Sequence, residues 1–313
     1  MKIESQIEKI SSFQHLELLS NQVVEGFISG MHKSPFHGFS AEFAEHKVYN
    51  AGESTKHIDW KLFAKTDRLY TKRFEEDTNL RCHIIIDNSS SMHYPKLKDS
   101  QPFYENKIGF AVLASAVLMN LLKKQRDAVG LSVYSDTYEY YAPEKGSERH
   151  HRMVLNALEN LLEKSPSKKS TDTITFLHQI AEKIHRRSMI ILFTDMFQSG
   201  SEASGEEALF NALQHLKHNK HKVVLFHVVD NKTERNFDFD KAPRKFIDVE
   251  TGEEVSVFAE NVKQEYEKQV KSYFEKLALT CAKNRIKYIP VGVGESFEKI
   301  LTTYLVEKQN FGK

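Results

Sequence analysis

From residue 80 onward, short apolar stretches alternate along the chain with longer stretches whose apolar positions have helical spacing. The short stretches are rich in β-branched residues, as strands buried on both faces of a sheet are; they are 82–86, 128–134, 189–194, 223–229 and 286–291. The helical stretches are 107–124, 148–163, 173–185, 206–219, 261–284 and 296–309, and 138–142 predicts an added edge strand. This alternation predicts an α/β fold with a mainly parallel sheet flanked by helices on both faces.

The first 79 residues have a different pattern, so we expect them to form an N-terminal region of their own. Apolar positions at helical spacing over 3–29 predict one or two helices. Residues 30–64 have little periodicity, and 68–81 is typical of an extended, charged segment. Residues 80–313 form the predicted α/β domain, with a polar insertion near 231–258 that contains a hairpin turned at Thr251 and Gly252.

Composition favours a soluble cytoplasmic protein. The formal net charge is only +1, which gives no overall field to attract nucleic acid or acidic membranes. Cys82 and Cys281 are the only cysteines and lie far apart, unlike a secreted disulfide framework. The start of the chain lacks the layout of a signal peptide. The most apolar stretch, 108–122, is shorter than the ~20 residues that cross a bilayer, so we predict a buried core helix and no membrane span.

Three predicted loops carry oxygen-bearing side chains at the carboxyl ends of strands, where ligands bind in open α/β sheets. The first holds Asp87, Ser89 and Ser91, the second Thr171, and the third Asp195. Carboxylate and hydroxyl oxygens suit Mg²⁺ or Mn²⁺. The alternative is an Asx or Ser turn that caps a helix without metal. Around Thr171 the choice stays open, because Ser170, Thr173 and Thr175 are close in sequence.

The three-loop pattern resembles the metal-ion-dependent adhesion site (MIDAS) of von Willebrand factor A domains. That resemblance implies that Ser89, Ser91 and Thr171 bind the metal through their hydroxyls, while Asp87 and Asp195 balance its charge directly or through water. It also implies an open coordination position that an Asp or Glu side chain of a protein partner fills. Lys169 and Ser170 stand where glycines are usual in such sites, and Met196 stands where many relatives have Gly.

The N-terminal region carries a second resemblance, which spans nearly the whole chain together with the A-like domain. Its motifs are Gly38-x-x-x-Glu42-Phe43, Tyr49-x-x-Gly52-Glu53 and Ile58-Asp59-Trp60. They resemble the bacterial family catalogued as domain of unknown function 58. The resemblance implies a partnership with a MoxR-type AAA+ ATPase, in chaperone-like maturation or remodelling of protein complexes.

Other motifs do not indicate an enzyme. The chain has no Gly-rich phosphate loop and no Gly-x-Ser-x-Gly elbow, so we expect a non-enzymatic binding protein. The competing hypothesis is a Mg²⁺-dependent hydrolase, a phosphatase or nuclease, that uses Asp87 and Asp195 with His93 as the base. We interpret His215, His218 and His221 as a solvated basic helix end rather than a zinc site.

Trp60 is the only tryptophan of the chain. We interpret it as an aromatic anchor that packs this region onto the sheet, with Asp59 holding a turn. The alternative is a docking surface for the ATPase.

Overall fold

The computed structural model of the 313-residue chain describes residues 16–31, 43–49, 58–74, 80–98, 100–135, 138–163, 173–196, 203–239, 243–247, 252 and 254–311. The chain divides into two units, Ile28–Asn79 and a larger unit of Met1–Phe27 with Leu80–Lys313. This division differs from the expected one at residues 16–27, which group with the sheet. The physical reason lies in helix α2 (Leu16–Met31), whose Leu16, Leu19 and Val23 are buried.

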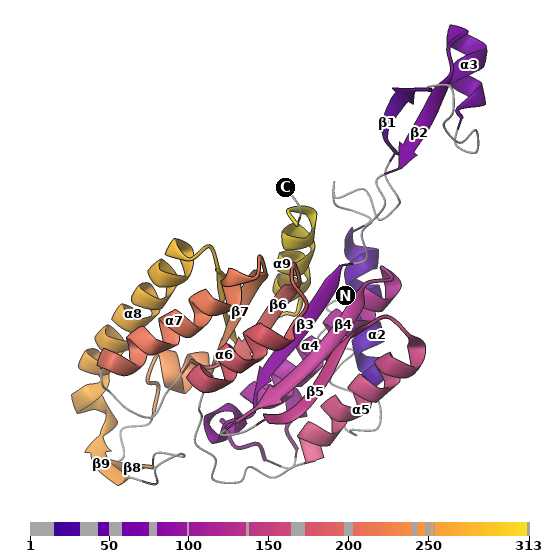
Figure 1. Ribbon diagram of the computed structural model, residues 1–313. Helices are drawn as coiled ribbons and strands as arrows, with labels where there is room; N and C mark the ends of the chain where they lie inside the picture. The colour runs from indigo at the N-terminus through magenta and orange to yellow at the C-terminus, as the bar shows by residue number, and fades with distance from the viewer. Residues whose placement is uncertain are drawn as a thin grey trace. The chain divides into compact units, whose positions relative to one another are not determined.

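The larger unit is built on a six-stranded sheet with the order β10-β7-β6-β3-β4-β5 (Figure 1). Its strands are β3 (Arg81–Asp87), β4 (Ala128–Tyr134), β5 (Tyr138–Lys145), β6 (Met189–Thr194), β7 (Lys222–Val229) and β10 (Lys287–Gly292). All neighbours pair in parallel except β5, which is antiparallel to β4. The predicted α/β fold with a mainly parallel sheet is therefore confirmed, including the added edge strand.

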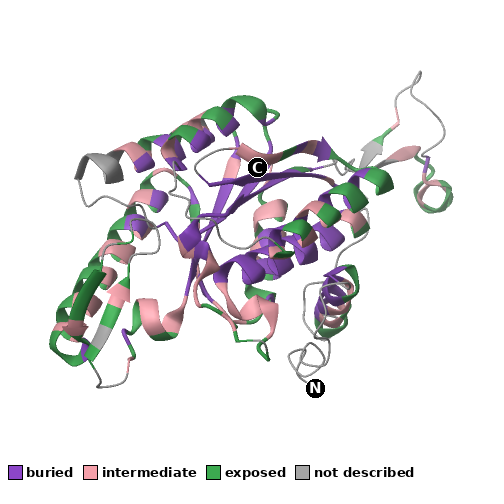
Figure 2. Cartoon of the chain, turned by 90° about the horizontal axis from the view of Figure 1, so that it is seen from below, coloured by how far each residue is buried: buried purple, intermediate pink, exposed green. Residues whose placement is uncertain are grey.

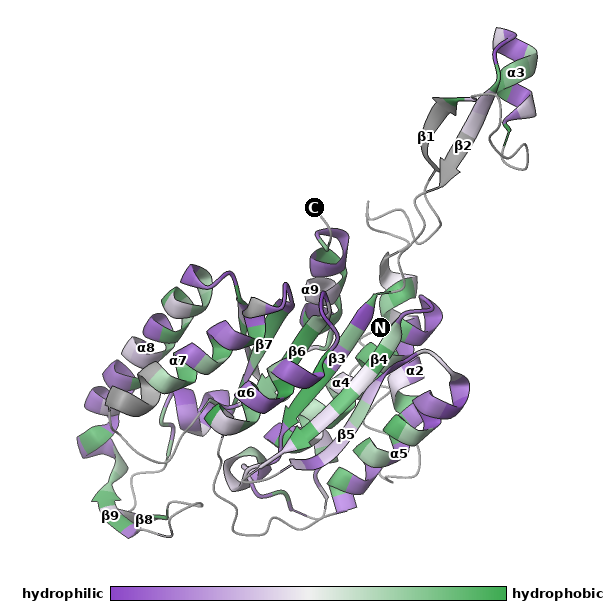
Figure 3. Cartoon of the chain, viewed as in Figure 1, coloured by the Kyte–Doolittle hydropathy of each residue, from purple (hydrophilic) through white to green (hydrophobic). Residues whose placement is uncertain are grey.

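Helices cover the sheet on two faces. Figures 1 and 3 show α6 and α7 across one face and the apolar strands in the middle; buried side chains of α6, α7 and α8 pack there on Ile85, Leu192 and Leu225. Helices α4 and α5 contact β4 on the other face. In addition to α2, the larger unit contains the helices α4 (Lys107–Lys124), α5 (Glu148–Glu163), α6 (Thr173–Lys183), α7 (Ala203–His218), α8 (Ala259–Lys283) and α9 (Glu298–Gln309). It also contains the short 3₁₀ turns η3 (Ser90–His93) and η4 (Phe103–Glu105).

Helix α4 is the central helix of this unit. Every residue from Lys107 to Leu122 is buried, and Figure 2 shows the helix and the strands as the buried centre. A helix that is apolar all round needs cover on every side, and the side chain of Asn120 on α4 donates a hydrogen bond to Ser20 of α2. The predicted core helix is thus confirmed. Among the described helices, none combines the length and apolarity that a bilayer span requires.

The strand order creates a switch point between β3 and β6. The chain leaves β3 through α4 toward β4, whereas it leaves β6 through α7 toward β7, in the opposite direction along the sheet. Adjacent strands with diverging connections leave a crevice at their carboxyl ends, where open α/β sheets bind ligands. Asp87 ends β3, and Asp195 directly follows β6, so the topology brings two of the predicted site residues to one place.

The segment 231–258 interrupts the alternation, as predicted. It begins with a π-helical turn, η5 (Asn231–Arg235), and contains the antiparallel hairpin β8 (Pro243–Ile247) and β9 (Glu254–Phe258). Gly252, in the predicted turn, has a φ of 77°, which only glycine adopts without strain. The hairpin forms a small sheet of its own.

The smaller unit contains β1 (Phe43–Val48), β2 (Tyr70–Phe74) and α3 (Trp60–Thr66). The two strands pair antiparallel. Asp59 caps α3, since its carboxylate accepts hydrogen bonds from the N–H groups of Lys61 and Leu62. The turn role predicted for Asp59 is confirmed. Trp60 stacks edge-on against Phe63 of the same helix, with ring centroids 6.2 Å apart, and its role in packing this region onto the sheet stays a prediction.

Candidate metal centre

Asp87 is fixed at the end of β3 by neutral donors. Its side chain is 1% exposed. One carboxylate oxygen accepts the N–H of Ser89 at 2.9 Å, and the other accepts the hydroxyl of Thr194 at 2.8 Å and that of Tyr134 at 3.4 Å. Thr194 ends β6, so this bond ties the first predicted loop to the third. Burial raises the pKa of Asp87 to about 7, and the nearby carboxylate of Asp195 adds to the rise.

Two hydroxyls converge beside Asp87. The Oγ atoms of Ser89 and Ser91 lie 3.0 Å apart. Two neighbouring ligands of an octahedral Mg²⁺, each about 2.05 Å from the ion, lie about 2.9 Å apart. The two hydroxyls are hydrogen-bonded to each other at this distance, and the same spacing is compatible with one edge of a magnesium coordination shell. The donor set, hydroxyl and carboxylate oxygen without sulfur, fits a hard divalent cation.

Asp195 has a charged partner that sequence reasoning missed. The ammonium of Lys107, on the first residue of α4, donates to the Oδ2 atom of Asp195 at 2.8 Å. It also donates to the Oε1 atom of Glu234 at 2.5 Å. Glu234 lies in η5, directly after β7, so a fourth loop supplies a carboxylate to this edge of the sheet. The sequence did contain a signal for Lys107, because a lysine in the first turn of a mainly apolar helix is unusual.

The four charged groups leave the site short of positive charge. Lys107 is fully buried, and the side chains of Asp195 and Glu234 are 0% and 16% exposed. Burial alone would lower the pKa of Lys107, but the two carboxylates raise it above its usual value, so the ammonium stays charged. When all three carboxyl groups are ionised, Asp87, Asp195 and Glu234 carry three negative charges against one positive charge, and burial opposes this state by raising the pKa of Asp87 and of Glu234. The remaining two negative charges equal the charge of one divalent cation.

The predicted hydroxyl ligand of the second loop, Thr171, lies outside the described residues. Thr173, one of the alternatives, begins α6 and is buried. Its side chain is hydrogen-bonded to the hydroxyl of Tyr134, which in turn reaches Asp87. The structure thus brings together Asp87, Ser89, Ser91 and Asp195, and it adds Thr173 and Thr194 behind the carboxylate of Asp87.

His215 and His221, two of the histidines considered as zinc ligands, have partners within the protein. His221 is 1% exposed and accepts the N–H of Ser188, so its prediction as a solvated residue is wrong. His215 is hydrogen-bonded to His178 and lies 3.0 Å from a carboxylate oxygen of Glu182. No described group of three or more His, Cys, Asp or Glu side chains is arranged to hold a metal. The candidate centre depends on serine hydroxyls instead. Cys82 and Cys281 are free and buried.

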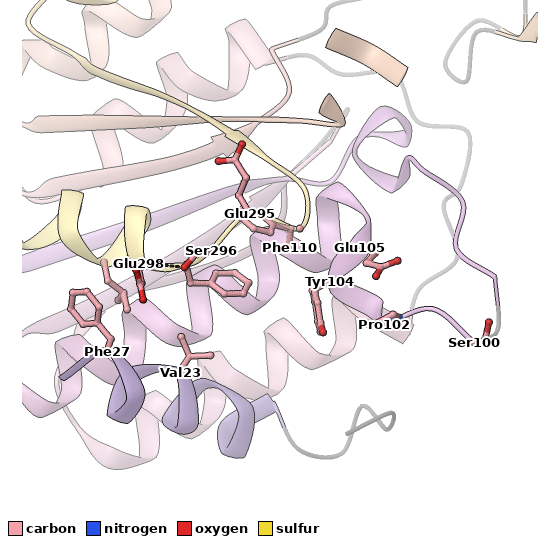
Figure 4. A pocket seen from close by; sticks show the side chains of 13 residues that line it. Val23, Phe27, Ser100, Pro102, Tyr104, Glu105, Phe110, Glu295, Ser296 and Glu298 are labelled. Atoms are coloured by element: carbon pink, nitrogen blue, oxygen red, sulfur yellow. Dashed lines mark hydrogen bonds between the residues drawn. The ribbon is translucent and has the colours of Figure 1, made fainter. Parts of the chain in front are cut away.

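A separate cavity of about 490 Å³ lies beside α2 (Figure 4). Its floor is apolar, with Phe27, Phe110 and Leu301, and glutamates such as Glu298 stand around it. None of the predicted site residues lines it. Its link to the metal centre is indirect, through a 3.0 Å bond from Asn231 of η5 to Glu295.

Comparisons with known proteins give the family context. The sequence profile described as "Protein of unknown function DUF58" matches residues 45–276. Among curated proteins, the chain is 20% identical over 185 residues to "Uncharacterized protein Rv1480" of Mycobacterium tuberculosis. That match covers 59% of this chain and 56% of the relative, so the chain spans little more than half of the relative's length.

A search of solved structures matches this chain to several proteins, among them the following two. One is BatB from Bacteroides thetaiotaomicron, 15% identical over 74% of this chain and 99% of BatB, with a TM-score of 0.41. The other is the SpRpn10 VWA domain, 14% identical over 72% of this chain and 94% of that domain, with a TM-score of 0.37.

Proposed function

The chain belongs to the DUF58 family of proteins of unknown function, and from this premise we propose that it is a metal-dependent protein-binding protein. Mg²⁺ or Mn²⁺ binds at the carboxyl ends of β3 and β6, and an Asp or Glu side chain of a partner protein completes its coordination. The protein acts by binding rather than by turnover. The partner that the resemblance implies is a MoxR-type AAA+ ATPase, with which this chain would take part in maturing or remodelling protein complexes in the cytoplasm.

The observation that carries this proposal is the pair of serine hydroxyls, 3.0 Å apart, beside the buried carboxylate of Asp87. Hydroxyls are neutral ligands, so an ion held by them keeps more of its positive charge than an ion held by carboxylates. Such an ion attracts an external carboxylate more strongly. The position at the switch point supports the same role, because a partner side chain can enter from beyond the strand ends.

Asp87→Ala tests the proposal. Calorimetry with Mg²⁺ and Mn²⁺ should detect binding to the unaltered protein and none to the variant, while circular dichroism reports an intact fold. Asp238→Ala is the matched control, because it removes an exposed carboxylate elsewhere in the same unit. Capture of the purified MoxR-type ATPase of the same host should need the divalent ion and Asp87. Ion binding that persists in Asp87→Ala would refute the site.

The same variant separates binding from hydrolysis. A phosphatase or nuclease would turn over a generic phosphoester such as p-nitrophenyl phosphate, and Asp87→Ala would abolish that turnover. The chemistry of the site gives little support to this outcome. Lys107 is fully buried and its ammonium is occupied by two carboxylates, so it is not accessible to a substrate phosphate. His93, the base that hydrolysis would use, is hydrogen-bonded to Asn88 at 3.0 Å.

A further inference from the structure

Lys107 is the least expected residue of the candidate centre. It is one of the largest fully buried side chains of the described chain, although lysine is almost never fully buried unless it is paired. It begins α4, whose N-terminus already carries partial positive charge. Placing an ammonium there is unfavourable unless nearby carboxylates compensate it, and two do, from the loops after β6 and β7.

The position of the ammonium is determined from several sides. Asp195 and Glu234 accept its hydrogen bonds, and its Nζ lies 5.9 Å from the centre of the Tyr94 ring. The hydroxyl of Tyr94 donates to Thr233 at 2.7 Å, which ties the serine-bearing loop to η5. The main-chain N–H of Lys107 also donates to the carbonyl oxygen of Tyr94. These contacts hold the side chain between the loops and leave it no path to solvent.

The consequence for Asp195 is that its Oδ2 atom is already occupied. Asp87 and Asp195 are therefore unequal, since Asp87 receives hydrogen bonds from neutral donors and Asp195 from a cation. A carboxylate paired with an ammonium attracts a second cation less strongly, because the ammonium offsets part of its charge. Asp87 keeps that attraction, and it lies beside the two serines.

We propose that Lys107 is a positioning residue that keeps Asp195 from binding the ion directly, and so leaves a coordination position for the carboxylate of a partner. This inference rests on the proposed function. The ion is held by hydroxyls and acts on Asp195 through water. Without the ammonium, Asp195 can approach the ion directly. The variant then binds the ion more tightly and an external carboxylate more weakly.

Loss of the ammonium should strengthen ion binding and weaken carboxylate binding, so the two changes can be told apart by measurement. In Lys107→Met the centre has three formal negative charges instead of two, so we expect Mn²⁺ to bind at least about tenfold more tightly. Electron paramagnetic resonance of free Mn²⁺ gives the dissociation constant. Water-proton relaxation gives the number of water molecules on the bound ion, which should fall by one as Asp195 replaces a water. Acetate, used as the external carboxylate, should then bind at least about tenfold more weakly.

A control variant separates the role of Lys107 from general charge. Lys124→Met removes an exposed lysine at the other end of α4 and should leave both binding constants unchanged.

Each outcome decides the matter. If the unaltered protein binds no Mn²⁺, the proposed function fails and the inference fails with it. If it binds Mn²⁺ but Lys107→Met changes neither the affinity nor the water number, only the inference is overturned. Should Lys107→Met not fold, Asp195→Asn replaces it as the test. The number of bound waters should then stay constant, and a gain of one water would show that Asp195 is a direct ligand and overturn the inference.

Discussion

The hydrogen bonds of Asp127 allow a quantitative prediction of how much the contacts at the amino-terminal edge of the sheet stabilise the larger unit. It precedes β4 and is 2% exposed. Its Oδ1 atom accepts the buried N–H of Leu80 at 3.0 Å, and its Oδ2 atom accepts the hydroxyl of Tyr304 at 3.0 Å and the ammonium of Lys308 at 2.5 Å. One carboxylate thus joins the entry to β3 with the last helix, α9. We expect Asp127→Ala to destabilise the larger unit without affecting the metal centre, which lies at the opposite ends of the strands.

The magnitude follows from what the substitution leaves behind. The N–H of Leu80 becomes a buried donor without a partner, which costs about 1–3 kcal/mol. Tyr304 and Lys308 lose less, because both also donate to the side-chain oxygen of Gln125, at 3.2 and 2.8 Å. Together they add about 1 kcal/mol. The free energy of unfolding should therefore fall by about 2–4 kcal/mol.

Urea unfolding, followed by circular dichroism, measures this loss. Tyr304→Phe is the matched variant, because it removes the hydroxyl that donates to Asp127 and Gln125 but leaves Leu80 with its acceptor. It should cost about 1 kcal/mol. A loss in Asp127→Ala no larger than that in Tyr304→Phe would refute the reasoning, since it would mean that the N–H of Leu80 does not depend on the carboxylate. Mg²⁺ affinity should be the same in both variants and in the unaltered protein.

Two further predictions concern the sheet. Burial lowers the pKa of His227 to about 4, against about 6.5 in the unfolded chain, so the folded state holds the neutral form. The free energy of unfolding should then fall by about 3 kcal/mol as the pH drops from about 6.5 to about 4; His227→Gln should flatten this part of a pH series of urea unfolding. Gly130→Ala would place a Cβ 2.5 Å from the ring nitrogen of His83 and 2.9 Å from the carbonyl oxygen of Ala142. Thermal or urea unfolding should show a loss of about 1–3 kcal/mol, and a neutral result would contradict the packing.

The strands of the larger unit were predictable because burial on both faces selects β-branched residues in short runs. The predicted ranges 128–134 and 189–194 coincide with β4 and β6, and those for β3, β7 and β10 agree to within one residue at each end, whereas β5 runs on to Lys145, beyond the predicted 138–142. Parallel topology then places the carboxyl ends at one edge, which is why Asp87 and Asp195 could be expected together. No long-range contact had to be known for either inference.

The parts that were not predictable depend on tertiary contacts. Strand β1 was missed because Phe43–Val48 has mixed polarity and gains its ladder from Tyr70–Phe74, more than twenty residues away. Glu234 was missed because its loop has no periodic pattern, and Lys107 because lysines at helix ends are usually solvated.

The unequal partners of Asp87 and Asp195 determine where a cation is needed. The ammonium of Lys107 neutralises charge on the side of Asp195 and Glu234, whereas the donors to Asp87 are an N–H group and two hydroxyls that carry no net charge. The raised pKa of Asp87 reflects this, because burial and a neighbouring carboxylate both oppose its ionised form. The uncompensated charge therefore lies next to the serine oxygens. A divalent ion bound next to the serine oxygens would offset this negative charge and take the hydroxyls as ligands. The uncompensated charge that destabilises the metal-free site therefore favours binding of the ion.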